Sequence, residues 1–160
     1  MRFVVTEVAV LRAGTVLAHY IFTNPIPWNL LTKSDKSCAS WLIVNHHGLR
    51  WEDGNVPYNM AKRLITSAVL GAEEDGETPT LVYVKGCQKR EWLVDLLENY
   101  ARKIPIVETL DADYEDIESL NNLDVANTIR CGKHVKNCAL QNVLKIFNWW
   151  SRRQKEFIYI

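Results

Sequence analysis

The sequence lacks the long apolar runs and the charge imbalance that mark several classes of protein. No apolar run is long enough to cross a bilayer, and the opening stretch MRFVVTEVAV is interrupted by Glu7, unlike a signal peptide. We therefore expect an intracellular protein, cytoplasmic or nuclear, with no membrane contact. Lys and Arg number 19 and Asp and Glu number 19, so the net charge is zero. Zero net charge argues against a protein that coats nucleic acid by bulk electrostatic attraction.

Internal repeats, low-complexity tracts and long linkers are also absent from the 160 residues. A chain of this length can bury a core without disulfide bonds. Its composition, 48% hydrophobic and 24% charged, is that of a globular protein. We predict a single domain over residues 1–160.

The charge that is present is strongly segregated along the chain. Residues 104–129 contain seven acidic and no basic side chains, whereas residues 130–155 contain seven basic and no acidic side chains. The basic segment ends in WWSRRQK, where tryptophan could stack on nucleobases while cations hold phosphates. An apolar helix stripe that buries one tryptophan is the alternative. The candidate nucleic-acid contacts are Lys85, Lys89, Trp150, Arg152, Arg153 and Lys155.

Apolar periodicity and turn residues predict a mixed α/β protein. β-branched and aromatic runs favour strands, whereas apolar residues at helical spacing favour helices that end at Gly48 and Gly71. We expect strands over 2–12, 15–22, 81–85 and 104–109, and helices over about 37–47, 57–70, 88–101 and from about 137 onward. Ser34 or Ser37 can cap the first helix. Because strand–helix–strand units need parallel crossovers, we predict one mixed sheet with helices on both faces.

The four cysteines divide into two pairs. Cys131 and Cys138 flank His134 in the sequence CGKHVKNC. In a reducing compartment this spacing indicates metal binding rather than a disulfide, and sulfur and imidazole ligands are typical of zinc. Cys38 and Cys87 lie among apolar residues, and we predict that both are small core side chains.

Three ligands leave a structural zinc site incomplete, because such sites are four-coordinate. Spacing alone does not identify the fourth ligand, and the candidates are Cys38, Cys87, His46, His47, His19, Glu7 or another carboxylate. Glu7 interrupts the apolar strand VVTEVAV. On an exposed strand it would face water; on a central strand it would be buried and need a partner, which a metal ion would supply.

The order of elements resembles the DEDDh 3′–5′ exonucleases of the RNase H-like superfamily over about residues 3–150. The family's first motif is Asp-x-Glu on the first strand, where this chain has Val5-Thr6-Glu7. The family's second Asp follows a buried strand, where this chain has residues 85–89 with lysines and no Asp. An Asp-Thr-Leu strand corresponds to Glu108-Thr109-Leu110. The last helix of the family begins His-x-Ala-x-x-Asp, and residues 137–142 read NCALQN.

Of the family's four acids and one His, only Glu7 is retained. Two-metal hydrolysis needs several carboxylates around the cations. One Glu with Asn142 and nearby lysines cannot form that site, so we predict no catalytic residue and a degenerate exonuclease-like domain.

A Glu on the first strand followed by Cys-x-x-His and a further Cys is similar to the Glu-Cys-His-Cys signature of the Maelstrom domain. The resemblance implies an RNase H-like fold with one structural Zn²⁺ held by Glu7, Cys131, His134 and Cys138. It further implies binding of single-stranded RNA or a protein partner in RNA-guided transposon silencing, the piRNA pathway. This chain differs from the family in its short His-to-Cys gap and in having no attached DNA-binding box.

Two alternative functions use other residues. A metal-independent ribonuclease that cuts single-stranded RNA would draw its acid–base and phosphate-contacting groups from His46, His47, Glu52, Lys85 and Lys89. Adjacent histidines at a helix end more often cap carbonyl groups, however. A protein–protein interaction module of viral or transposon origin would use the six tryptophans and the charge-split surface.

Overall fold

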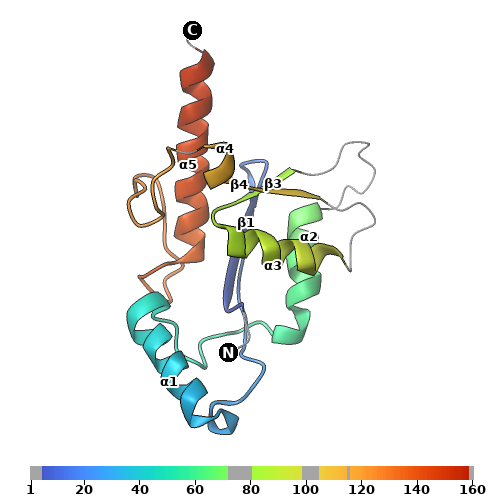
Figure 1. Cartoon of the computed structure of the whole chain (residues 1–160), viewed down its shortest axis with the longest axis vertical. Helices are drawn as coiled ribbons and strands as arrows, with labels where there is room; N and C mark the ends of the chain where they lie inside the picture. The colour runs from blue at the N-terminus through green and yellow to red at the C-terminus, as the bar shows by residue number, and fades with distance from the viewer. Residues whose placement is uncertain (1–4, 72–80, 99–104, 115, 159–160) are drawn as a thin grey trace. The chain divides into compact units, whose positions relative to one another are not determined.

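A computed structural model describes residues 5–71, 81–98, 105–114 and 116–158 (Figure 1). The segment GAEEDGETP, whose composition predicts an acidic surface loop, lies outside the described residues after Gly71. The chain divides into two compact units, Met1–Asn59 with Ser119–Ile160, and Met60–Glu118. The single domain over residues 1–160 stays a prediction, and each unit is described by itself.

The first unit opens with an antiparallel hairpin of β1 (Glu7–Arg12) and β2 (Val16–Ile21). Its turn runs through Ala13 and Gly14, which have φ values of 54° and 72°. This left-handed conformation favours glycine. A Cβ atom on Gly14 would lie 2.7 Å from Cζ of Phe147, so a side chain here would also meet this ring.

The first long helix is α1 (Lys33–Leu42), which follows the short helix η1 (Trp28–Leu30) and continues into the π-helical turn η2 (Ile43–His47). Its N-cap is Thr32, whose hydroxyl accepts a hydrogen bond from the Asp35 N–H, rather than the predicted Ser34 or Ser37. Gly48 ends the turn with φ of 70°, as the sequence predicts.

The last helix, α5 (Ala139–Ile158), contacts β1 within the same unit (Figure 1). It begins just after Asn137, whose φ of 49° is left-handed and incompatible with a helix interior. Apolar side chains from the hairpin, the loops and this helix form the core, chiefly Phe22, Leu49, Leu123, Cys138 and Leu140. The burial of Leu140 holds the start of α5 in this core.

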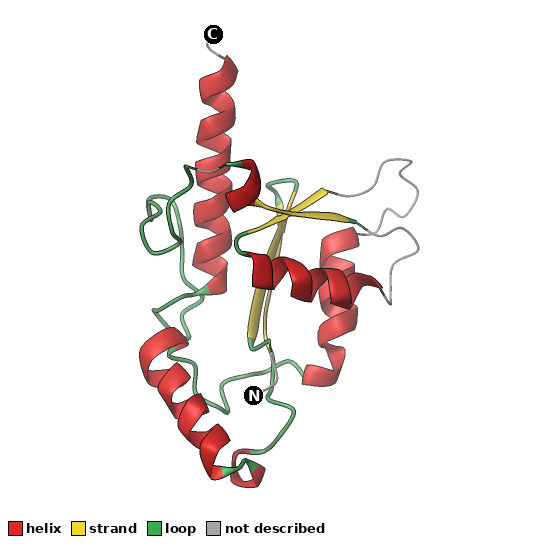
Figure 2. Cartoon of the chain, in the orientation of Figure 1, coloured by secondary structure: helices red, strands yellow, loops and turns green. Residues whose placement is uncertain are grey.

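The second unit contains a parallel strand pair joined by a helix (Figure 2). Its elements are α2 (Ala61–Leu70), which follows η3 (Tyr58–Met60), then β3 (Leu81–Val84), α3 (Cys87–Glu98), β4 (Ile106–Thr109) and α4 (Leu110–Asp113). Gly71 ends α2 as predicted. Its core is aliphatic, with Ile65, Leu93, Leu97, Val107 and Leu110 at most 5% exposed.

The predicted mixed α/β composition is confirmed, but the described strands form two separate two-stranded sheets rather than one mixed sheet. The local sequence identifies a strand, whereas the pairing of strand edges depends on contacts between distant segments. The RNase H-like arrangement, with helices on both faces of one sheet, therefore stays a prediction. No helix among the described residues is long and apolar enough to span a membrane.

Two burial predictions are wrong. Cys38 and Cys87 are exposed instead of lying in the core. Cys38 precedes Ala39, the residue that α1 buries, but its own side chain is exposed to solvent. The short apolar run LVYVK between Pro79 and Gly86 is typical of a buried parallel strand, but Leu81 is 54% exposed.

Candidate metal centre

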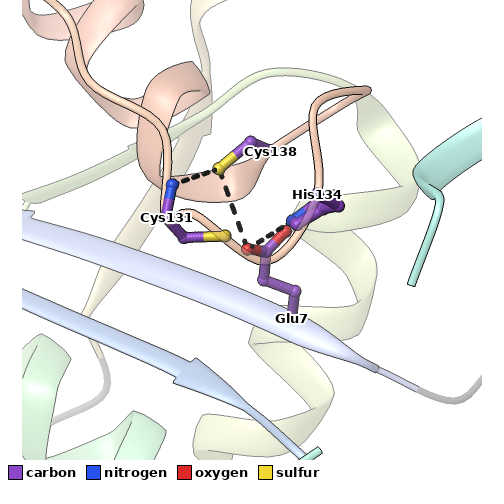
Figure 3. Close-up of side chains that lie close together, drawn as sticks. All are labelled: Glu7, Cys131, His134 and Cys138. Atoms are coloured by element: carbon purple, nitrogen blue, oxygen red, sulfur yellow. Dashed lines mark hydrogen bonds and ion pairs between the residues drawn. The ribbon is translucent and has the colours of Figure 1, made fainter. Parts of the chain in front are cut away.

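Glu7 begins β1, and its side chain is only 6% exposed. Its carboxylate points toward a loop that precedes α5, where Cys131, His134 and Cys138 lie (Figure 3). Of the two environments considered for this residue, the structure has the buried one. A buried carboxylate needs charged or hydrogen-bonding partners.

The loop before α5 turns its three sequence-predicted ligands toward one point. Gly132 and Asn137 have positive φ values of 84° and 49°, which reverse the chain on either side of His134. The Cys131 N–H donates to Cys138 Sγ at 3.4 Å. One ligand atom from each of Glu7, Cys131, His134 and Cys138 lies within 4.8 Å of the other three. This group could hold one metal ion.

The carboxylate of Glu7 is held through both oxygens. Oε1 accepts a hydrogen bond from the Ala139 N–H at 2.9 Å, at the N-terminus of α5. Oε2 lies 2.7 Å from Nε2 of His19 and 3.0 Å from Nε2 of His134. Burial alone would raise the pKa of Glu7, but the bonds from Ala139, His134 and His19 outweigh it and lower the pKa. The carboxylate is therefore ionised at neutral pH and available as a ligand.

His134 is oriented for coordination through Nε2. Its side chain is fully buried, and Nδ1 lies 2.6 Å from the His47 carbonyl oxygen and 3.0 Å from that of Lys136. Carbonyl oxygens only accept hydrogen bonds, so Nδ1 carries the proton. Metal-binding histidines are commonly oriented by such a bond. Nε2 then faces Glu7 Oε2, and that approach requires either a proton or a cation between the two atoms.

The turn at His46 and His47 supports this loop through its backbone. The Asn137 amide donates to the His46 carbonyl oxygen, and the His47 carbonyl accepts from His134. The Leu49 N–H donates to His47 Nδ1 at 2.9 Å. Burial and the neighbouring imidazoles of His46 and His134 lower the pKa of His47. Backbone carbonyl groups carry no sequence signal, so their role at the site was not predictable.

The donor set fits zinc. It comprises one carboxylate oxygen, one imidazole nitrogen and two thiol sulfurs, which matches the four-coordinate preference of structural zinc. Sulfur ligands disfavour Mg²⁺ and Ca²⁺, which take oxygen ligands. Burial raises the pKa of the Cys131 thiol. A metal ion would have to displace that proton, because the thiolate is the ligand.

The remaining candidates for the fourth ligand do not join this group. Cys38 and Cys87 are exposed, and His46 and His47 take part through their carbonyl groups. His19 contacts Glu7 but is not one of the four residues whose ligand atoms lie within 4.8 Å of one another.

The candidate nucleic-acid contacts fall into both units. Lys85 in the second unit is paired with Asp111, with 2.6 Å between Nζ and Oδ1. Lys89 is exposed on the first turn of α3. The metal-independent ribonuclease would combine these lysines with His46, His47 and Glu52 of the first unit. That combination stays a prediction.

The other candidate contacts lie on α5. Arg152 reaches Asp124 at 3.3 Å. The guanidinium of Arg153 lies 5.3 Å from the centroid of the Trp149 ring, a cation–π distance. Trp150 is partly exposed, and the side chain of Lys155 lies outside the described residues. Two tryptophans followed by two arginines therefore lie within residues 149–153 of this helix.

All six tryptophans lie in the described part of the chain. Trp41 is the most exposed of them, at 62%, and Val44 on the next turn is 70% exposed. Trp28 and Trp51 pack edge to face, with ring centroids 5.4 Å apart. One of the six tryptophans is therefore strongly exposed, and the interaction module stays a prediction.

Comparison with known proteins gives no relative: no family model, no curated protein and no solved structure matches the chain. The Glu-Cys-His-Cys group is present, but the identity as a DEDDh or Maelstrom domain stays a prediction.

Proposed function

We propose that this chain is a zinc-stabilised domain in which Glu7, Cys131, His134 and Cys138 hold one structural Zn²⁺. The observation that carries the proposal is the mutual approach of four ligand atoms to within 4.8 Å. Residue 7 is separated from residue 131 by most of the chain. Two hydrogen bonds orient two of these ligands. His134 donates to the His47 carbonyl oxygen, and Glu7 accepts from the Ala139 N–H.

Four protein ligands leave no open position for an activated water, so the proposed role is structural rather than catalytic. The ion would join the start of β1 to the loop that leads into α5. Because a structural metal site is not preformed in the unfolded chain, its binding energy becomes folding energy. We therefore assign no catalytic residue and propose a degenerate, exonuclease-like domain.

Metal analysis of protein purified without chelator tests the site. We expect one zinc ion per chain, and we expect Cys131→Ser to lose it because a hydroxyl is a poor zinc ligand. Cys38→Ser is the matched control, since Cys38 is an exposed thiol outside the group. Zinc content near zero in the wild-type protein would contradict the proposal.

We further propose that the zinc-stabilised domain binds single-stranded RNA through the end of α5. The support is the stacking of Arg153 on Trp149 beside Trp150 and the half-exposed Arg152. Aromatic rings next to cations are typical of single-strand binding surfaces. A role in piRNA-guided transposon silencing, which the Maelstrom resemblance implies, would use such a surface.

Anisotropy of a labelled single-stranded RNA, measured over a range of salt concentrations, tests this surface. Loss of Arg152 and Arg153 should weaken binding and reduce the slope of log affinity against log salt by about 1 per lost phosphate contact. Lys33→Ala, on an exposed residue of α1, is the control. Unchanged affinity would contradict the α5 surface. A zinc-loaded chain that binds no RNA would instead favour a protein partner.

A further inference from the structure

His19 approaches the candidate metal centre from the second strand of the hairpin. In the β1–β2 register Glu7 is opposite Ile21, and Ala9 is opposite His19. Residues two apart share a face of a strand, so Glu7 and His19 are diagonal neighbours on one face. Their side chains meet, with 2.7 Å between Nε2 of His19 and Oε2 of Glu7.

We infer that His19 is a positioning residue of the metal centre, which holds the Glu7 carboxylate in the orientation that coordination requires. The inference rests on the proposed zinc function. His19 donates its Nε2–H to Oε2, while the Ala139 N–H donates to Oε1. With a metal ion between His134 Nε2 and Oε2, each oxygen would accept one of these two bonds and keep a second lone pair for the ion. The two donors together fix the rotation of the carboxylate group.

His19 stands outside the set of ligands. Its side chain is 21% exposed, whereas that of His134 is fully buried. The four residues whose ligand atoms lie mutually within 4.8 Å do not include it. Hydrogen-bond partners of ligating carboxylates commonly raise metal affinity by about 10- to 100-fold. His19 therefore links β2 to a site whose ligands come from β1 and the loop before α5.

Competition with a chromophoric zinc chelator on the full chain tests the inference. We expect His19→Ala to weaken zinc binding about 10- to 100-fold while one ion still binds per chain. His19→Gln should recover most of the affinity, because its side-chain amide can donate from a similar position. His46→Ala is the matched control, since the hydrogen bonds of its imidazole and of its carbonyl go to Asn137 rather than to one of the four ligands.

Two further measurements separate positioning from a merely structural effect. With Co²⁺ in place of zinc, the thiolate-to-metal absorption of His19→Ala should equal that of the wild type, because the ligands are unchanged. In a double-mutant cycle, His19→Ala should have no further effect on zinc affinity once Glu7 is Ala. Both readouts are taken on variants whose circular dichroism confirms folding, and His19→Leu, which also lacks the donor, serves where His19→Ala does not fold.

Each contrary result has a distinct meaning. Wild-type zinc affinity in both His19 variants would overturn the inference and leave the proposed zinc site intact. Loss of the ion from His19→Ala together with altered Co²⁺ absorption would make His19 a ligand and also overturn it. A wild-type chain that binds no zinc would remove the proposed function itself.

Discussion

The two units each contain an ionised carboxylate with a lowered pKa, but the neighbours of the two groups differ. Asp111 in the second unit is 44% exposed, and its pKa is lowered chiefly by the hydrogen bond from Lys85. Glu7 in the first unit is 6% exposed and is surrounded by a backbone amide, imidazoles and a thiol. Asp111 already has a permanent cation beside it, whereas Glu7 does not. The comparison shows why a metal site is expected at one carboxylate and not at the other.

Metal removal should give the largest difference between the two units. We expect a chelator to lower the free energy of unfolding by about 4 kcal/mol, the linkage value when free zinc is 1,000-fold above its Kd. Thermal unfolding with and without chelator measures the effect, and zinc added back should reverse it. Equal Tm values would show that the Glu7 cluster is held by hydrogen bonds alone.

Neutralising each carboxylate compares the two groups directly. Glu7→Gln should destabilise the protein by about 3 kcal/mol, because it disrupts a buried charged network. Asp111→Asn should cost about 0.5 kcal/mol, since that pair is partly exposed and screened by water. Urea unfolding at neutral pH measures both values. Equal losses would mean that burial does not separate the two carboxylates.

The sequence predicts the parts of the site that lie close together in the chain. Cys131, His134 and Cys138 follow one another within a single loop, so their spacing alone indicates that they bind the same metal ion. The helix ends at Gly48 and Gly71 were also predictable, because glycine accommodates backbone conformations that other residues avoid.

Contacts at the site between residues that are far apart in the sequence were not predictable from local sequence patterns. The contact of His19 with Glu7 depends on the register of β1 and β2. The hydrogen bond that orients His134 depends on the carbonyl oxygen of His47, which is distant in the sequence. Residue spacing left several candidates for the fourth ligand, and the family resemblance pointed to Glu7. The exposure of Cys38 depends on which face of α1 packs inward, and the apolar neighbours alone predicted the wrong face.

The pH dependence of zinc binding should report on the thiols of the metal centre. Burial raises the pKa of the Cys131 thiol, so that thiol is protonated at neutral pH and must lose its proton on binding. Zinc affinity should therefore rise at least about tenfold per pH unit between pH 6 and pH 8. Isothermal titration in buffers of different ionisation enthalpy counts the released protons. An affinity that is flat over this range would contradict thiolate coordination by Cys131.

The smallest effect is expected at Lys85. In Lys85→Met the pKa of Asp111 should rise toward its ordinary value, because the main cause of its lowering is lost. A lowered pKa contributes stability above the ordinary pKa, and that contribution is lost as the pH falls through the folded value. The variant should therefore lose at most about 1 kcal/mol at neutral pH and show less dependence on acid. NMR titration of the Asp111 carboxyl carbon and urea unfolding at high and low salt measure both effects. Zinc content should stay at one ion per chain, since neither Lys85 nor Asp111 is among the four residues of the candidate metal centre. A loss of zinc in this variant would show that the two carboxylates are coupled rather than independent.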